Sequence, residues 1–385
     1  MTDIFVAGDN IISSLGFTAE ENFSNLKNNI TGIKIKDDGL LYPTAFPVSQ
    51  VDSTRLEIEF EKIGNTNNYT RLEKMFILSI TDALKQNKVD ITSPRTVFIF
   101  STTKGNIDLL EPTKKNLFEE DRLKLWGMSK EIAKYFNNSN EPIVVSNACI
   151  SGVLAIVIAQ RLINDGVYDN AIVAGGDIVS EFVVAGFQSF KSLSAEPCKP
   201  FDINRDGLSL GEGCATIILT NNQNLFNSTN RIKVMGGASS NDANHISGPS
   251  RTGDGLYFAI KNAMDDSGLT ANDIHYISAH GTATSFNDEM ESKAISWAKL
   301  NNVPVNSLKG YFGHTLGGAG AIESVIGIHS LRQNLLINTK GYSELGVPEK
   351  INVINETRHA ELKNFLKIAS GFGGCNAAVI FSKNE

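Results

Sequence analysis

Two halves of the chain resemble each other. GEGCATIILT at 211–220 resembles GGCNAAVIFS at 373–382, and each is a glycine turn followed by a strand pattern. IFVAG near the start resembles IKVMGG, and SNACISGVLAIVIAQRL resembles GHTLGGAGAIESVIGIHSL as a small-residue turn that leads into an apolar helix. A repeat constrains the fold strongly, because each copy must form the same supersecondary unit.

We therefore predict two similar halves, residues 1–225 and 226–385, that meet in the polar stretch NNQNLFNSTN. Strand patterns such as 96–100 and 365–369 alternate with helical patterns such as 319–332. Alternating strands and helices indicate an α/β fold. The polar stretch reads as a linker within one compact body.

Composition excludes several classes of protein. Among the 385 residues, 41% are hydrophobic, so the chain can bury a large core. The formal net charge is −7, and no basic stripe alternates with aromatic residues, which argues against nucleic-acid binding. The N-terminus lacks the pattern of a signal peptide, and no apolar run is long enough to span a bilayer, so we expect a soluble, cytoplasmic protein without membrane partners.

The four cysteines lie far apart and form no CxxC pair. This pattern argues against a disulfide framework or a metal site and fits a reduced compartment. Cys149 differs from the others because it lies where a β-branched run ends and an apolar helix begins, in SNACISG. A helix N-terminus lowers the pKa of a nearby thiol, which predicts a nucleophile, whereas a lone buried cysteine is usually inert.

Two glycine-flanked turns in the second half carry further reactive groups. His280, in AHGTATSFNDE, follows a strand pattern, and ligand sites of α/β sheets gather at the ends of strands. Lys309 and His314, in SLKGYFGHTLGGAG, flank a tight turn before a helix. One such histidine is usually a structural residue. Two, together with a cysteine at a helix start, predict a catalytic site.

Five motifs in order, spread over nearly the whole chain, resemble those of the β-ketoacyl-acyl-carrier-protein synthases of the thiolase superfamily. They are NACISG, HGTATSFND, KGYFGHTLGGAG, GFGGCNAA and the segment KPFDINRDGLSLGEG. The resemblance implies a thiolase fold, with two pseudo-duplicated βαβ halves in a layered αβαβα body. It implies an elongating, acyl-transferring synthase that condenses malonyl-carrier protein with an acyl group, in fatty-acid, polyketide or polyene synthesis.

The resemblance also assigns roles to residues. Cys149 would carry the acyl group, His280 and His314 would form the catalytic histidine pair, and Lys309 would support them. Glu291 would pair with that lysine, although it could instead close a capping box that begins at Asp288. Phe372 would gate the site, and its backbone N–H group would form an oxyanion hole with that of Cys149; the alternative is a simple core residue.

The same resemblance implies no metal and no organic cofactor, because the substrates travel on the phosphopantetheine arm of an acyl carrier protein. It implies a dimer, either of two copies or with a related synthase subunit. The chain departs from the common family pattern at Ile150, at Cys375 and in the polar segment 102–140. These departures place the choice of acyl substrate in doubt more than the chemistry.

Two other functions stay open. A thiolase-like acyltransferase also has a helix-start cysteine and a C-terminal cysteine in a glycine loop, as Cys375 is here; His280 and Lys309 favour the synthase. A non-condensing partner subunit of a heterodimeric synthase usually lacks the nucleophile, so Cys149 argues against it.

Overall fold

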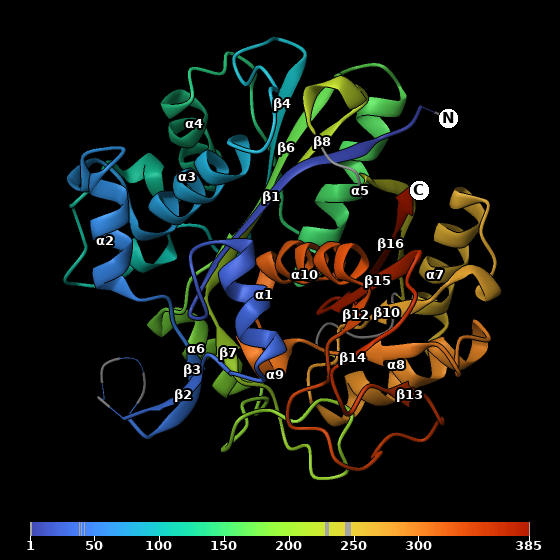
Figure 1. Cartoon of the computed structure of the whole chain (residues 1–385). Coiled ribbons are helices and arrows are strands. Elements are labelled where there is room, and N and C mark those ends of the chain that lie inside the picture. The colour runs from blue at the N-terminus through green and yellow to red at the C-terminus, as the bar shows by residue number, and fades with distance from the viewer. Residues whose placement is uncertain are drawn as a thin grey trace.

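A computed structural model describes residues 2–37, 39, 41, 43–227, 231–242 and 248–384. Its centre is a mixed sheet of eleven strands in the order β13-β11-β10-β15-β16-β9-β1-β8-β6-β4-β5 (Figure 1). In chain order these strands are β1 (Phe5–Ser13), β4 (Thr96–Ser101), β5 (Ile143–Val145), β6 (Asn170–Asp177), β8 (Gly213–Thr220), β9 (Arg231–Asn241), β10 (Tyr276–Ser278), β11 (Pro304–Asn306), β13 (Asn352–Val353), β15 (Asn364–Gly371) and β16 (Cys375–Asn384). The α/β prediction is therefore confirmed.

The strand order is symmetric about the contact between β1 and β9. On one side β1, β8, β6, β4 and β5 follow one another, and on the other side β9, β16, β15, β10 and β11 do the same. Within the sheet, the two halves join where Phe5 of β1 pairs with Lys233 of β9 in an antiparallel arrangement. The similar segments of the sequence thus occupy equivalent places. Residues 228–230 of the predicted linker lie outside the described part, and the boundary at 225 stays a prediction.

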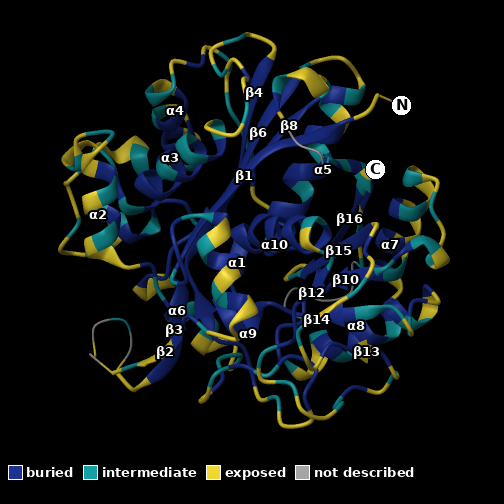
Figure 2. Ribbon diagram, viewed as in Figure 1, coloured by how far each residue is buried: buried dark blue, intermediate teal, exposed yellow. Residues whose placement is uncertain are grey.

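Helices form three layers around the two halves of the sheet. Helices α3 (Arg71–Leu84) and α4 (Leu125–Tyr135) supply one apolar core on the outer face of the first half. Helices α7 (Asp254–Ser267) and α8 (Ser285–Trp297) supply another on the outer face of the second. Helices α5 (Ser151–Asn164) and α10 (Ala319–Gln333) lie between the halves, and Figure 2 shows α10 buried there. This is the predicted αβαβα arrangement.

The two central helices contact each other through glycines. A Cβ atom on Gly152 of α5 would lie 2.6 Å from the backbone nitrogen of Ala321, and one on Gly320 would lie 2.4 Å from that of Val153. Such distances exclude any larger residue without a shift of the backbone. The small-residue turns of the sequence therefore let two buried helices start side by side, and each start carries a part of the site.

The remaining elements pack around the large sheet and its helices. They are α1 (Ala19–Lys27), α2 (Ser53–Glu61), α6 (Glu181–Ser189), α9 (Lys309–Phe312), a small sheet of β2 (Ile33–Lys36), β3 (Phe46–Ser49) and β7 (Leu210–Gly211), the pair β12 (Leu335–Leu336) and β14 (Arg358–His359), and the short turns η1 (Thr66–Asn68), η2 (Ile107–Leu110), η3 (Glu120–Leu123), η4 (Gln223–Leu225), η5 (Ala271–Asp273) and η6 (Leu316–Gly318). In the described part of the chain, every helix is too short or too polar to cross a membrane.

Candidate active site

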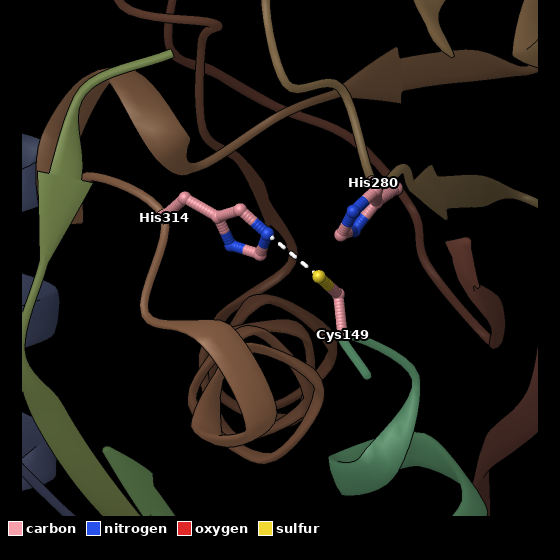
Figure 3. A group of neighbouring side chains, drawn as sticks. All are labelled: Cys149, His280 and His314. Carbon is pink, nitrogen blue, oxygen red and sulfur yellow. Dashed lines mark hydrogen bonds between the residues drawn. The ribbon is translucent and has the colours of Figure 1, made fainter. Parts of the chain in front are cut away.

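Three turns bring Cys149, His280 and His314 together (Figure 3). Cys149 lies between β5 and α5, His280 follows β10, and His314 follows α9. One ligand-type atom from each side chain lies within 4.8 Å of the others, and all three residues are buried. The Nε2 atom of His314 is 3.0 Å from the Sγ atom of Cys149, and the two imidazole rings stand edge to face at 5.1 Å. The structure therefore assembles the predicted group of three.

A strained turn presents Cys149. The preceding residue, Ala148, has a φ of 43°, in the left-handed region that alanine seldom adopts. Ser151 holds the turn: its Oγ accepts a hydrogen bond from the N–H of Asn147 at 2.8 Å and donates one to the carbonyl of Ala148 at 2.6 Å. Strained residues persist where their surroundings fix them, and here the strain directs the thiol into the site.

The Cys149 thiol is not ionised at rest. Burial raises its pKa to about 12, and the nearby Lys309 ammonium lowers it by less than burial raises it. The prediction of a lowered pKa for this thiol is therefore wrong, because burial disfavours the thiolate more than the nearby lysine ammonium groups favour it. A thiol that attacks a substrate from this state passes its proton to a base, and Nε2 of His314 is within hydrogen-bond distance.

Backbone contacts place His314. Its N–H group donates to the carbonyl of Ser209 at 2.7 Å, and its carbonyl accepts from the N–H of Gly211 at 3.1 Å. A Cβ atom on Gly211 would lie 1.9 Å from the carbonyl oxygen of Phe312, so this position accepts only glycine. The segment GLSLGEG therefore holds the turn of His314 in place through these backbone hydrogen bonds.

Both histidines are neutral. Burial, followed by the Lys309 ammonium, holds the pKa of His280 and the pKa of His314 well below their usual range. Lys309 Nζ lies 3.3 Å from Nδ1 of His280 and donates to the carbonyl of His280 at 2.6 Å. Because an ammonium can only donate, Nδ1 of His280 accepts and its proton lies on Nε2. That N–H group is free to donate to a substrate.

The carboxylate that pairs with Lys309 is Glu323, at 2.7 Å. The prediction that Glu291 pairs with this lysine is wrong. Glu291 instead accepts the backbone N–H groups of His280 at 2.5 Å and Gly281 at 2.7 Å, so it fixes the turn after β10. The alternative capping box is also absent, since α8 begins at Ser285 and the Asp288 carboxylate accepts from the N–H groups of Thr282, Ala283 and Phe201.

Sequence reasoning missed two buried charges, Glu323 and Lys367. Glu323 lies in α10, and Lys367 lies in the strand NFLKIASG, where its Nζ atom is 2.5 Å from Oε2 of Glu323. Each is a charge flanked by apolar and small residues, in AGAIESVIG and in NFLKIASG. Charges in such positions are rarely buried without a partner, so this pattern was the signal that could have found them.

A cavity of about 470 Å³ opens onto the site and is lined by Cys149, His280, His314 and Phe372, among others. This volume suits a small organic ligand. The Phe372 ring is 37% exposed and stacks on Phe187 at 5.9 Å. A Cβ atom on Gly371 would lie 3.0 Å from the backbone nitrogen of Cys149, so the loop of Phe372 contacts the nucleophile. Its roles as a gate and in an oxyanion hole stay predictions.

The three central side chains could also bind a metal ion. A thiolate and two imidazoles with atoms within 4.8 Å of one another form a set that zinc accepts. Zinc would, however, require the thiolate form, which burial disfavours here. The absence of a metal cofactor therefore stays a prediction.

The fold and the site define a thiolase-fold protein in which a buried cysteine lies beside two histidines. Residues 1–224 match the family described as "Beta-ketoacyl synthase, N-terminal domain", and residues 232–343 match "Beta-ketoacyl synthase, C-terminal domain". The chain belongs to the β-ketoacyl synthase family.

Individual relatives agree with this membership. The chain is 34% identical to a putative mitochondrial 3-oxoacyl-[acyl-carrier-protein] synthase of Schizosaccharomyces pombe, over 62% of this chain and 60% of that protein. It is 27% identical to 3-oxoacyl-[acyl-carrier-protein] synthase 2 of Mycobacterium leprae, over 98% of this chain and 96% of that protein. A chain in the complex of the ketosynthase ApeO with its chain length factor ApeC, from Xenorhabdus doucetiae, matches at 26% identity with a TM-score of 0.87, over 100% of this chain and 98% of that one.

Proposed function

We propose that the protein is a 3-oxoacyl-acyl-carrier-protein synthase, an acyltransferase that elongates fatty-acid or polyketide chains by decarboxylative condensation. The observation that carries the proposal is the contact of the Cys149 thiol with Nε2 of His314 beside a neutral His280, in a cavity large enough for a thioester. Family membership supports it. Several curated relatives align over only about 60% of their own length, so the activity is a proposal for this chain.

In the first half-reaction, the thiol attacks an acyl thioester. His314 accepts the proton of Cys149 while the sulfur bonds to the acyl carbon, because the free thiolate is too costly in this buried site. The tetrahedral oxyanion lies near the backbone N–H group of Cys149, where we place an oxyanion hole with the N–H of Phe372. The carrier thiolate leaves with the proton from His314, and the acyl group stays on Cys149.

In the second half-reaction, a malonyl thioester loses carbon dioxide. The electron pair of the broken carbon–carbon bond becomes an enolate, and the negative charge develops on the thioester oxygen. The Nε2–H group of His280 stabilises that oxygen as the charge appears, and His314 does so too in the tautomer that carries its proton on Nε2. The enolate carbon then attacks the acyl carbon on Cys149, the thiolate leaves, and it takes up one proton to regenerate the thiol.

The substrates in this proposal are carried by an acyl carrier protein in the cytoplasm, and no organic cofactor takes part. We also propose a dimer, with a second copy or with a related synthase subunit. Strand β5 is the last strand at one edge of the sheet, and an edge strand readily accepts a partner. The segment 102–140 precedes it and exposes Leu110, Leu117 and Trp126.

The test measures product. Purified protein is incubated with an acyl carrier thioester and malonyl carrier protein, and carbon dioxide and 3-oxoacyl carrier are quantified. The proposal predicts equal amounts of both. A thiolase-like acyltransferase would instead cleave a 3-oxoacyl thioester with free thiol and would not use the malonyl carboxylate. A non-condensing subunit would yield neither product, whether or not Cys149 is replaced by alanine.

A further inference from the structure

A second lysine is buried behind His280, and none of the steps above uses it. Lys367 is the one charged residue of β15, its side chain is fully buried, and it lies opposite Ser278 in the parallel pairing of β15 with β10. A buried ammonium is costly unless several hydrogen bonds compensate the loss of water. The contacts of Lys367 therefore indicate the role of this side chain.

The two lysines share one carboxylate. Lys367 Nζ donates to Oε2 of Glu323 at 2.5 Å, and Lys309 Nζ donates to Oε1 at 2.7 Å. Lys367 also donates to the carbonyls of Ser278 at 3.2 Å and Ala279 at 3.1 Å. With the contact of Lys309 to the carbonyl of His280, the two ammonium groups bind three consecutive carbonyls at the end of β10.

This arrangement decides where the third N–H group of Lys309 points. If Glu323 had no other partner, both of its oxygens could turn towards Lys309 and draw that ammonium away from the imidazole. Because Lys367 occupies Oε2, Lys309 receives a single carboxylate oxygen and keeps one N–H group for Nδ1 of His280. The group formed by the two lysines and Glu323 also carries one more positive than negative charge.

We propose that Lys367 is a positioning residue for His280: by binding Glu323 and the end of β10, it directs Lys309 onto Nδ1 and so keeps His280 neutral with its proton on Nε2. The kinetic consequence rests on the proposed function, because that N–H group is the donor that the enolate needs. The tautomer itself does not depend on any substrate.

The charged and titratable groups that face His280 come from every element around it. They are Cys149 before α5, His314 after α9, Lys309 in α9, Glu323 in α10, Lys367 in β15, and Glu291 and Asp288 in α8. Lys367 acts in the same direction as Lys309 on both imidazoles, after burial and Lys309 itself. Removal of its charge therefore favours the imidazolium form.

The experiment compares the wild-type protein with Lys367→Met by NMR of protein labelled with ¹⁵N-histidine, without substrate. The signals of His280 are assigned from their loss in His280→Gln. We expect the Nε2–H tautomer in the wild type, and in Lys367→Met a mixture of tautomers with a pKa of His280 higher by about one pH unit. Lys74→Met, which removes the ion pair of Lys74 on α3 with the half-exposed Glu57 on α2, is the control and leaves His280 unchanged.

Kinetics supply the second measurement. In Lys367→Met the acid limb of the pH profile of malonyl decarboxylation is expected to move up by about one pH unit, so the rate relative to wild type is lower at pH 5 than at pH 8, since protonated His280 is the inactive form. A merely structural role would lower the rate by the same factor at both pH values. If wild type releases no carbon dioxide, the proposed function fails, and the NMR result still decides the role of Lys367.

Lys367→Gln covers the case in which the methionine variant does not fold, because its amide can still donate to Glu323 while the charge is removed. It is expected to raise the pKa of His280 in the same direction. A folded Lys367→Met or Lys367→Gln protein that keeps the wild-type tautomer and the wild-type pKa of His280 overturns the proposal.

Discussion

The Nε2 atom of His314 lies 3.0 Å from the Cys149 thiol, whereas Nδ1 of the same ring is buried without a hydrogen-bond partner among the described residues. His280, by contrast, has its Nδ1 beside Lys309. No contact therefore fixes the tautomer of His314 among the described residues, so its Nε2 atom can either accept the thiol proton or carry a proton itself. His280 is fixed with its proton on Nε2, as a donor. Under the proposed function, this difference gives proton transfer to His314 and constant stabilisation of charge to His280.

His314→Ala is expected to impair both half-reactions. Loss of the base slows the acylation of Cys149, and loss of one N–H donor slows malonyl decarboxylation by about 10²- to 10³-fold. His280→Ala should slow decarboxylation by a similar factor and change acylation much less. Single-turnover measurements of each half-reaction separate the two effects. Equal losses of acylation in the two variants would refute the division of roles.

Glu323→Gln should destabilise the fold more than a surface substitution does. It leaves Lys309 and Lys367, both fully buried, without their shared counter-charge, and the loss of one partner from a buried ion pair costs about 3–5 kcal/mol. Chemical denaturation measures the change in the free energy of unfolding. Glu57→Gln, at the half-exposed pair with Lys74, is the control and should cost under about 1 kcal/mol.

Glu291 should make stability depend on pH. Burial raises its pKa from the ordinary 4.5 to about 7 in the folded protein, whereas the backbone N–H groups of His280 and Gly281 oppose that shift. A carboxyl whose pKa is higher in the folded state binds more protons there, so its contribution is fully present below pH 4.5 and is lost as the pH rises to about 7. That loss amounts to ~3 kcal/mol.

The check is the free energy of unfolding at pH 5 and pH 7 for wild type and Glu291→Gln. The glutamine variant is less stable than wild type at low pH, but its free energy of unfolding lacks the decrease with pH that Glu291 causes. The difference in the free energy of unfolding between the two proteins should therefore shrink as the pH rises. A difference that stays constant, or grows, between the two pH values would contradict the raised pKa.

Ala148→Gly should stabilise the protein and slow the acylation of Cys149. Glycine adopts a φ of 43° without strain, which is worth about 1 kcal/mol to the folded state, but it also frees the backbone that directs Cys149. We expect a higher melting temperature with a lower rate of acylation. Ala283→Gly, at another left-handed alanine with a φ of 64°, should give the stability without loss of acylation.

The sequence patterns were sufficient to predict an α/β fold with two similar halves because the repeated motifs carry their own turns, whereas the layered body came from the family resemblance. GEGCATIILT and GGCNAAVIFS became β8 and β16, which occupy equivalent places in the two halves. Cys149, His280 and His314 were predictable for the same reason: each lies in a small-residue turn at the end of a strand or the start of a helix. Lys309 followed from its place in the same turn as His314.

The partners of those residues were not predictable. Glu291 was assigned to Lys309 by position along the chain, but the bond that forms joins α9 to α10, and Glu323 faces the lysine from there. Lys367 comes from β15, which lies next to β10 in the sheet although it is 89 residues away from Ser278. The pKa of Cys149 also depends on burial, which local sequence does not reveal.

The central claim is that Cys149 carries the acyl chain between the two half-reactions. Intact-protein mass spectrometry after incubation with a panel of acyl carrier thioesters measures it directly, followed by addition of malonyl carrier protein. We predict one acyl mass per chain that is absent in Cys149→Ala and disappears when the malonyl carrier is added. An adduct that persists in Cys149→Ala, or one on Cys149 that malonyl carrier does not remove, would contradict the account.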